Sequence, residues 1–376
     1  MVQRITSGKY DVIRVLAVDE KNRWLYFIAS PDNPAQRFLY RIGLDGKGLK
    51  RLSPANQAGS HSYNISPDAQ WAVHSFSSFA APPVSNFIKL AAHKTVRGLE
   101  SNKGLCEKLS KLKQPATEFF RGKIADDVEV DAYAVLPPDL DKTKKYPLLV
   151  YVYGEPAGQT VVDRWGGSGG MWHWMLAQQG YVVMSIDNRG TTAPRGNAWR
   201  KSIYRQVGIL AARDQAAAVR QGLKDQPFLD ANRVGVWGWS GGGSMTLNAM
   251  FKFPDLYHTG ISIAPVPNQR LYDTIYQERY MGLPKDNVEG YKNGSPITYV
   301  KQLKGKLLLV HGTVDDNVHY QGMAKLIHEL VSHNKKFEMI AYPNRTHSIR
   351  EGKGTTLHLR TAMTDFLRRA LPPGPQ

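Results

Sequence analysis

The segment 238–242 reads GWSGG and carries the pattern G-x-S-x-G around Ser240. It follows an apolar strand-like run, 233–239, and precedes a run of helical character, 243–252. This context is typical of a nucleophile elbow, in which small flanking residues permit a tight turn that lifts the serine hydroxyl above a sheet. The positive end of the following helix would lie beneath the reacting group. We therefore predict that Ser240 is a nucleophile.

A serine nucleophile needs a base and an acid that orients the base, and in this architecture they follow the serine in the order acid, then histidine. Asp315 and Asp316 come just after the strand-like run 306–311, and His347 follows the next such run, 337–342. His347 is therefore the predicted base. The spacing alone leaves both aspartates open as the acid.

Other histidines surround these candidates. His311 lies within a strand-like run and is predicted to be structural. Three more are predicted to be surface or packing residues: His319, His328 and His333.

Acyl transfer also needs two donors for the developing oxyanion. The backbone N–H of Gly241 follows the nucleophile and is the first candidate. Tyr153, in the loop after the apolar run 147–153, is the second. A tyrosine that only packs against its neighbours would explain Tyr153 equally well.

From residue 146 onward, strand-like and helical patterns alternate. Further strands are expected at 117–124, 128–136, 180–186 and 257–264, and helices at 171–179, 209–224, 318–331 and 357–371. Such alternation predicts an α/β fold with a mostly parallel sheet covered by helices on both faces. The glycine-rich stretch 164–170 is expected to be a surface loop, because no P-loop Lys-Ser/Thr pair follows it.

The first 90 or so residues read as short strands at 12–18, 24–28, 38–42, 61–65 and 71–76. Polar turns precede both Trp24 and Trp71, which lie 71 − 24 = 47 residues apart, near the period of a propeller blade. Two such units cannot close a ring. We expect the end of a β-propeller, or a β module that packs on the second domain. Within the Lys-rich stretch 95–115, Leu105, Leu109 and Leu112 have helical spacing, so a short amphipathic helix is expected there.

Composition bounds the possible partners. The 376 residues are 42% hydrophobic, with 49 Lys and Arg against 32 Asp and Glu, a net charge of +17. The basic stretch 89–123 shows no nucleic-acid-binding motif, so we expect no nucleic-acid partner. No window has the length and apolarity of a membrane span.

The sequence also shows no recognisable cofactor-binding motif and no targeting signal. Cys106 is the single cysteine, which excludes an intrachain disulfide and a multi-cysteine zinc site. We expect no metal, nucleotide or flavin cofactor. The first residues do not read as a signal peptide, so the compartment is left open.

Three motifs together resemble the dipeptidyl peptidase IV branch of the prolyl oligopeptidase family of serine peptidases: GWSGG at 238–242, HGTVDDNVH at 311–319 and YDTIYQERYMG at 272–282. The resemblance runs from about residue 10 to the C-terminus. It implies an α/β-hydrolase domain at 116–376, preceded at 1–115 by the last blades of the family's eight-bladed propeller and a linker helix.

The resemblance assigns roles to individual residues. It implies Ser240 as nucleophile, Asp315 as acid, His347 as base, and Tyr153 with Gly241 as the oxyanion site. The implied substrate pocket comprises Tyr272, Tyr276, Val266, Val318, Asn317 and Trp239. The two tyrosines would form an aromatic box for a proline ring, and Asn317 would hold the carbonyl of the P2 residue.

Two positions depart from the family pattern. Gly241 stands where better-known members carry a bulky aromatic residue, and Gln269 stands where they carry tryptophan, so a more open S1 pocket is expected. The family's propeller glutamates, which bind the substrate's amino terminus, have no counterpart in this chain, and the turn residues Asp19 and Glu20 are no convincing substitute.

Three functions remain open on these grounds. The first is a dipeptidyl peptidase IV-type peptidase that releases Xaa-Pro or Xaa-Ala dipeptides through an acyl-enzyme. The second is an esterase or broad acyl hydrolase that uses the same triad on small esters. The third is a weakly catalytic fragment or an interaction module. A homodimer is expected from the resemblance only.

Overall fold

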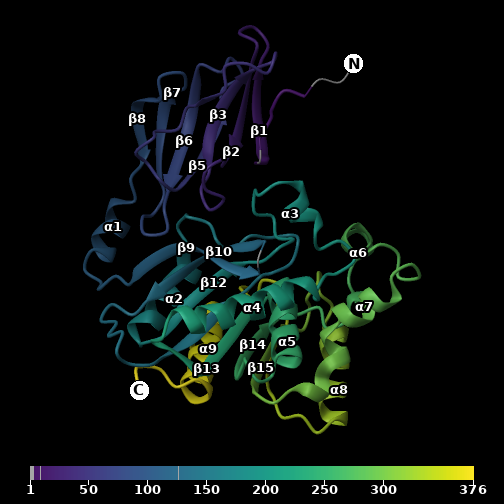
Figure 1. The fold of residues 1–376 in the computed structure, drawn as a ribbon. Helices are drawn as coiled ribbons and strands as arrows, with labels where there is room; N and C mark the ends of the chain where they lie inside the picture. Colours follow the sequence, from purple (N-terminus) through teal and green to yellow (C-terminus); the bar gives the residue numbers. More distant parts are fainter. Residues whose placement is uncertain (1–3, 9, 126) are drawn as a thin grey trace. The chain divides into compact units, whose positions relative to one another are not determined.

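The computed structural model describes residues 4–8, 10–125 and 127–376. The chain divides into two compact units (Figure 1). Unit 1 comprises Met1–Gln114, Val161–Met171 and Ala193–Trp199, and unit 2 comprises Pro115–Thr160, Trp172–Thr192 and Arg200–Gln376. Two short segments from the middle of the chain thus belong to unit 1.

Unit 1 contains two four-stranded antiparallel sheets whose strands follow the order of the sequence. The first sheet holds β1 (Val12–Asp19), β2 (Trp24–Ala29), β3 (Phe38–Gly43) and β4 (Lys50–Arg51). The second holds β5 (Ser60–Ile65), β6 (Trp71–Ser77), β7 (Val84–Lys89) and β8 (Lys94–Glu100). Trp24 and Trp71 each begin the second strand of their sheet, so the predicted repeat is confirmed.

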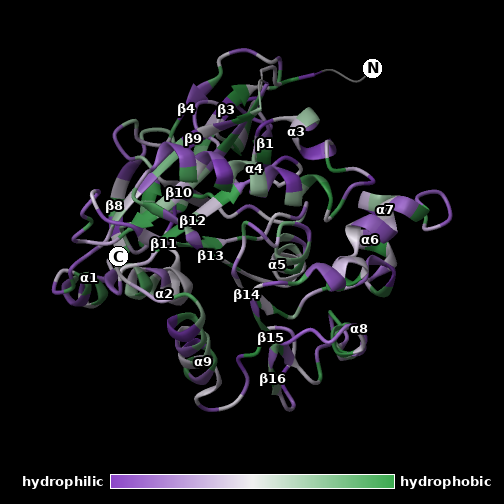
Figure 2. Ribbon diagram, turned by 60° about the horizontal axis from the view of Figure 1, so that its bottom comes forward, coloured by the Kyte–Doolittle hydropathy of each residue, from purple (hydrophilic) through white to green (hydrophobic). Residues whose placement is uncertain are grey.

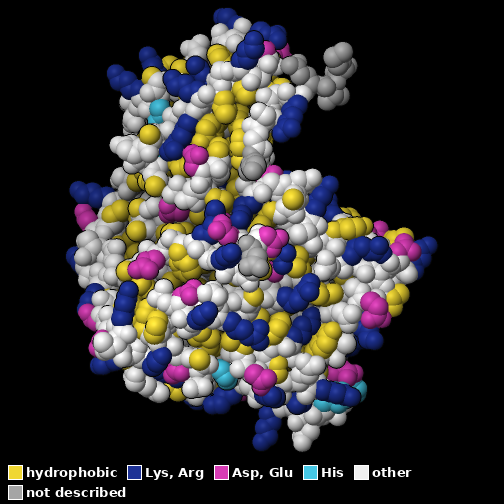
Figure 3. Space-filling view, viewed as in Figure 1, with side chains coloured by type: hydrophobic (Ala, Val, Ile, Leu, Met, Phe, Trp, Pro, Cys, Tyr) yellow, Lys and Arg dark blue, Asp and Glu magenta, His cyan; other side chains and the backbone are white. Residues whose placement is uncertain are grey.

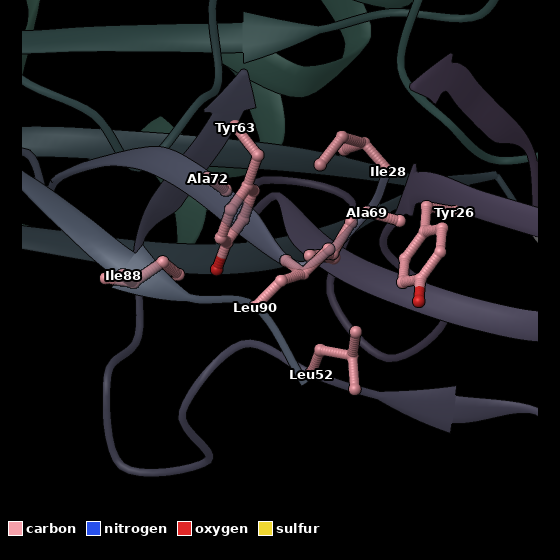
Figure 4. Close-up of a cluster of buried hydrophobic side chains, with 9 residues drawn as sticks. Tyr26, Ile28, Leu52, Tyr63, Ala69, Ala72, Ile88 and Leu90 are labelled. Carbon is pink, nitrogen blue, oxygen red and sulfur yellow. The ribbon is translucent and has the colours of Figure 1, made fainter. Parts of the chain in front are cut away.

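A buried cluster joins the two sheets of unit 1 (Figure 4). Its buried members are Tyr26, Ile28, Leu39, Leu52, Tyr63, Ala69, Ala72, Ile88 and Leu90. Alternate residues of a strand point to the same face, and in β5 His61 and Tyr63 are buried while Ser62 and Asn64 are exposed. This period of two explains why a short polar-rich strand still contributes to the core.

The short helix expected within 95–115 is present, but it covers only part of that stretch. Residues Lys94–Glu100 form β8, which pairs with β7, and the helix α1 covers only Lys103–Leu109. Thr95 and Val96 are β-branched and favour a strand, and the ladder to β7 is available at the sheet edge. Leu112 lies beyond the helix.

The expected loop at 164–170 is also partly wrong, because helix α2 begins at Gly167 and runs to Gln178. Close backbone packing explains Gly166, just before this helix: a Cβ there would lie 2.9 Å from the Cα of Gly170.

Unit 2 is built on one eight-stranded sheet with the order β16-β15-β14-β13-β11-β12-β10-β9. Its strands are β9 (Ala116–Ala125), β10 (Val128–Leu136), β11 (Tyr146–Tyr151), β12 (Val182–Asp187), β13 (Leu229–Trp239), β14 (Thr259–Ile263), β15 (Lys306–Gly312) and β16 (Glu338–Tyr342). The pairs from β12 to β16 are parallel, whereas β10 pairs antiparallel with β9 and β12. Hydrophobic residues mark the central strands β12 and β13, as buried parallel strands require (Figure 2).

The remaining helices are α3 (Asn197–Lys201), α4 (Leu210–Asp225), α5 (Gly241–Lys252), α6 (Thr274–Met281), α7 (Val288–Gly294), α8 (Tyr320–Ser332) and α9 (Thr355–Ala370), with 3-10 turns η1 (Gln269–Leu271) and η2 (Pro296–Gln302). Adjacent residues of β14 show that helices cover both faces of the sheet. Thr259 donates its hydroxyl to the carbonyl of Ala370 in α9, whereas Gly260 lies against Met250 of α5. The predicted α/β-hydrolase architecture is confirmed.

The basic residues do not gather on one site of the face in view. Figure 3 shows Lys and Arg side chains spread over that face with Asp and Glu among them. Within the described residues, no helix has the length and apolarity needed to cross a membrane.

Candidate active site

Ser240 lies in the tight turn between β13 and α5, with φ 60° and ψ −122°. A positive φ is costly for a residue other than glycine, by about 1–3 kcal/mol, and such strain clusters at functional sites. The backbone N–H of Ser240 donates to the carbonyl of Ile263 at 2.8 Å, which helps to hold the turn. A Cβ on Gly238 would collide with Gly242, and a Cβ on Gly242 would collide with the carbonyl of Val152. The two outer glycines of the motif are therefore required by packing.

The turn also presents the start of helix α5. Ser240 occupies the N-cap position, but its side chain makes no capping hydrogen bond. The N–H groups of the first helical turn, beginning at Gly241, have no partners within the helix. They lie where they would stabilise a negative charge on a group bonded to Ser240.

His347 contacts Asp315 through a 2.8 Å hydrogen bond from Nδ1 to Oδ2. The Asp315 side chain is fully buried, whereas the His347 side chain is 21% exposed. Oδ1 of Asp315 accepts backbone N–H bonds from Asn317 at 3.0 Å and Val318 at 2.8 Å. Asp316 is exposed, so the structure brings the first aspartate of the pair to the histidine.

A second histidine holds the same carboxylate. His311 is fully buried, and its Nε2 lies 2.8 Å from the carbonyl of Val318 and 3.2 Å from Oδ2 of Asp315. Because a carbonyl only accepts, Nε2 carries the hydrogen. The prediction that His311 is merely structural missed this contact with the acid.

These hydrogen bonds decide the charge of Asp315. Burial by itself would raise the pKa of this carboxyl, but the hydrogen bonds from His311, His347 and the Val318 N–H together lower the pKa below its usual range. Asp315 is therefore ionised at neutral pH and favours the tautomer of His347 with hydrogen on Nδ1. Nε2 of His347 is then the basic nitrogen.

Trp239 connects the histidine loop to the serine turn. Its indole Nε1 donates to the backbone carbonyl of His347 at 2.9 Å. Trp239 is the last residue of β13 and immediately precedes Ser240. Since β13, β15 and β16 are parallel, the residues that follow them emerge at one edge of the sheet.

The loop after β11 packs directly on the serine turn, where Val152 borders Gly242. Gly154 has φ +74°, and its carbonyl accepts a 3.0 Å hydrogen bond from Nδ2 of Asn188. Burial and the nearby charge of Glu155 raise the pKa of Tyr153 above its usual range. Tyr153 therefore keeps its hydroxyl hydrogen at neutral pH and can donate it.

Several predicted pocket residues contact one another. The rings of Tyr272 and Tyr276 lie edge to face, with centroids 5.3 Å apart. The Tyr272 hydroxyl donates to Oδ1 of Asn317 at 2.9 Å. Val266 and Val318 are both buried. The structure thus brings Tyr272 and Tyr276 into contact with each other, and Tyr272 into contact with Asn317 from a separate segment of unit 2.

Two polar side chains at this pocket are buried: Glu155, which was not predicted to take part, and Gln269, which was expected in the pocket wall. Oε2 of Glu155 accepts a 2.7 Å hydrogen bond from the Tyr276 hydroxyl. Gln269 accepts from Nε2 of Gln277 at 2.6 Å through its own Oε1. The position of Glu155, two residues beyond the predicted oxyanion tyrosine, was the available signal. Among the described residues, no group of three His, Cys, Asp or Glu side chains is placed to hold a metal ion.

The sheet order, the strained serine at its turn and the histidine–carboxylate pair are those of an α/β-hydrolase. Residues 171–373 match the model of the prolyl oligopeptidase family, and residues 1–83 match the dipeptidyl peptidase IV N-terminal region. The chain belongs to the prolyl oligopeptidase family, as its motifs predicted.

Individual relatives support the same assignment. Prolyl endopeptidase FAP of Homo sapiens is 31% identical over 97% of this chain and 48% of its own length. Probable dipeptidyl-aminopeptidase B of Emericella nidulans is 34% identical over 92% of this chain and 38% of its own length. The crystal structure of Porphyromonas gingivalis dipeptidyl peptidase 4 superimposes with a TM-score of 0.93 and 36% identity, covering 99% of this chain and 51% of that one. The chain therefore spans about half the length of these relatives.

Proposed function

We propose that the chain is a serine peptidase of the dipeptidyl peptidase IV type, acting on peptide N-termini with proline or alanine at P1. The observation that carries the proposal is the 2.8 Å bond between His347 and Asp315, in a loop that Trp239 ties to the Ser240 turn. The names of the relatives point to the same chemistry. Residues 116–376 would be the catalytic domain and residues 1–115 the end of a propeller.

The proposed acylation begins with Ser240. Its Oγ attacks the scissile carbonyl carbon while Nε2 of His347 takes the hydroxyl proton. Asp315 stays ionised and stabilises the imidazolium that forms. His347 then gives the proton to the leaving amine, and an acyl-enzyme remains on Ser240.

The oxyanion of this step would receive two hydrogen bonds, one from the backbone N–H of Gly241 and one from the Tyr153 hydroxyl. Buried donors of this kind stabilise charge that develops in the transition state. Water activated by His347 then attacks the acyl carbon, and Ser240 is released with its proton restored.

Substrate would be held by the remaining residues of the pocket. Tyr272 and Tyr276 would enclose the P1 ring, Val266 and Val318 would supply apolar walls, and Asn317 would bind the P2 carbonyl. The edge-to-face tyrosine pair and the burial of both valines support this arrangement.

The test compares Gly-Pro-p-nitroanilide with p-nitrophenyl butyrate, using the whole chain and its Ser240→Ala variant. Hydrolysis of the anilide that is lost in the variant supports the peptidase. Ester hydrolysis without anilide hydrolysis supports the second candidate, a broad acyl hydrolase. That candidate is favoured by the location of every proposed triad and oxyanion residue within unit 2, because a small ester needs no further anchor.

An interaction module without catalysis is the third candidate. A fluorophosphonate probe that labels the wild type but not Ser240→Ala would exclude it. A homodimer, proposed from the resemblance alone, is tested by the mass of the chain in light scattering.

A further inference from the structure

Glu155 lies directly beside the residue that follows the nucleophile. It belongs to the loop after β11 and is only 4% exposed. A Cβ built on Gly241 would lie 2.9 Å from both Cδ and Oε2 of Glu155. The carboxyl of Glu155 therefore occupies space that a side chain at position 241 would need, and such a side chain would have to displace it.

One carboxyl oxygen of Glu155 is satisfied and the other is not. Oε2 accepts the 2.7 Å hydrogen bond from Tyr276, the residue proposed to enclose the P1 ring. Oε1 is buried and has no hydrogen-bond partner among the described residues. An unpaired buried polar atom is costly, so a ligand group that pairs with Oε1 is favoured over one that does not.

Among the described residues, those that act on the pKa of Glu155 include a hydroxyl donor, Tyr276, but no cation. The ionisable groups whose pKa values respond to it are Tyr153 of its own loop, Tyr272 before α6 and Tyr276 within α6. From α5 the neighbour is Gly241, which has no side chain. Burial raises the pKa of Glu155 to about 7, although the hydrogen bond from Tyr276 acts in the opposite direction.

We propose that Glu155 is a specificity-determining residue of the S1 pocket. It selects P1 residues that carry a hydroxyl, such as a hydroxylated proline, over P1 residues with the same carbon skeleton and no hydroxyl. The inference rests on the proposed function, because it assumes acyl transfer at Ser240. A hydroxyl on P1 can hydrogen-bond to Oε1, whereas a bare ring leaves that oxygen unpaired. Sites built around buried polar groups discriminate strongly against ligands that cannot pair with them.

The selection depends on pH. A bare proline ring beside Oε1 favours the neutral carboxyl, because neither the ring nor the buried surroundings solvate the ion. A P1 hydroxyl can donate to the ionised form. The preference for a hydroxylated P1 residue therefore increases as the pH rises through 7.

The experiment uses activated esters, so that only the S1 pocket and the triad are needed. Hydrolysis of the p-nitrophenyl esters of N-acetylproline and of both epimers of N-acetyl-4-hydroxyproline is measured from pH 6 to 8.5. The proteins are the wild type, Glu155→Gln, Glu155→Ala and Ser240→Ala. Glu278→Gln, an exposed acid in the same helix as Tyr276, is the matched control for loss of one charge.

The wild type is expected to lose about tenfold in kcat/KM for the proline ester per pH unit above 7, and one hydroxyproline epimer is expected to escape this loss. Glu155→Gln removes the loss and keeps a preference for the hydroxyl, since an amide still hydrogen-bonds. Glu155→Ala removes both effects, and Glu278→Gln removes neither.

Equal hydrolysis of the proline and hydroxyproline esters by the wild type at every pH would overturn the inference. So would a hydroxyl preference that persists in Glu155→Ala. Ester hydrolysis that is unchanged in Ser240→Ala overturns the proposed function and the inference together, whereas Ser240-dependent hydrolysis with no P1 preference overturns only the inference.

Discussion

Histidines meet other polar groups in both units, but the two settings differ in one respect. In unit 2, His347 and His311 both contact the buried carboxylate of Asp315. In unit 1, His61 and His74 are buried and stacked with ring centroids 5.1 Å apart, and His74 is stacked on Tyr63. Their ring nitrogens contact each other at 2.9 Å rather than a carboxylate.

The hydrogen-bond partners of the unit 1 histidines determine which ring nitrogens carry hydrogen. Nε2 of His61 lies 3.0 Å from the carbonyl of Gln57 and must donate, so Nδ1 accepts from Nε2 of His74. Burial lowers the pKa of His61 to about 4 and that of His74 to about 3. Burial thus makes the two unit 1 histidines neutral packing groups, whereas in unit 2 the ionised Asp315 orients His347, the proposed base.

The largest expected effect comes from removing that carboxylate. Asp315→Asn leaves the size of the side chain but favours the wrong tautomer of His347, as in the unit 1 pair. We expect kcat for p-nitrophenyl butyrate to fall by about 10³- to 10⁴-fold. Asp316→Asn, its exposed neighbour, is the control and should change kcat less than twofold. Equal losses in the two variants would contradict the assignment of the acid.

The unit 1 pair should confer acid sensitivity. The folded-state pKa values of His61 and His74 lie below the ordinary histidine value of 6.5, so their contribution to stability is present above that pH and is lost as the pH falls toward 4. We expect a loss of roughly 2 kcal/mol per histidine by pH 5. Hydrogen exchange of β5 and β6, corrected for intrinsic rates, should report it, with β15 of unit 2 as internal reference.

A ring that cannot titrate should reduce this acid sensitivity. In His74→Phe, the stacking is kept and about half of the pH dependence should disappear. His328→Phe, on the exposed surface of α8, is the control. Exchange in β5 and β6 that is independent of pH in the wild type would contradict the prediction.

Glu155 should give stability the opposite dependence on pH. Its folded-state pKa is raised from 4.5 to about 7, so its contribution to stability is complete below pH 4.5 and is lost as the pH rises through 7. The free energy of unfolding of Glu155→Gln, relative to wild type, should therefore increase by roughly 2 kcal/mol between pH 5 and pH 8. Urea unfolding at both pH values measures it. A pH-independent difference would show that Glu155 is not a buried titrating acid.

The smallest effect is expected at His311, which positions the acid without reaching substrate. His311→Phe removes one donor from Asp315 and should lower kcat by about tenfold with little change in KM, since one charged hydrogen bond is lost. The pKa of Asp315 should increase toward its usual range, because one of the hydrogen bonds that lower it is lost. His311→Gln, which can still donate, should restore part of the rate. A change in KM alone would indicate a merely structural role.

The local sequence was sufficient to predict several features of this protein. Ser240 could be predicted from G-x-S-x-G between a strand and a helix, because only glycines fit around so tight a turn. The strands β11 to β16 and the repeat at Trp24 and Trp71 followed from apolar runs and turn residues. These features depend on the conformations and sizes of residues close together in the sequence, so the sequence shows them directly.

The tertiary structure alone decided what those features contact. By spacing, Asp315 and Asp316 were equivalent, and only burial against His347 and His311 separates them. Glu155 read as an ordinary loop acid until packing against Gly241 and Tyr276 buried it. Strand β8 was not among the predicted strands, because its own residues do not reveal the pairing with β7. Burial, pKa and strand pairing arise between segments that are far apart in the chain, and local sequence does not determine which segments meet.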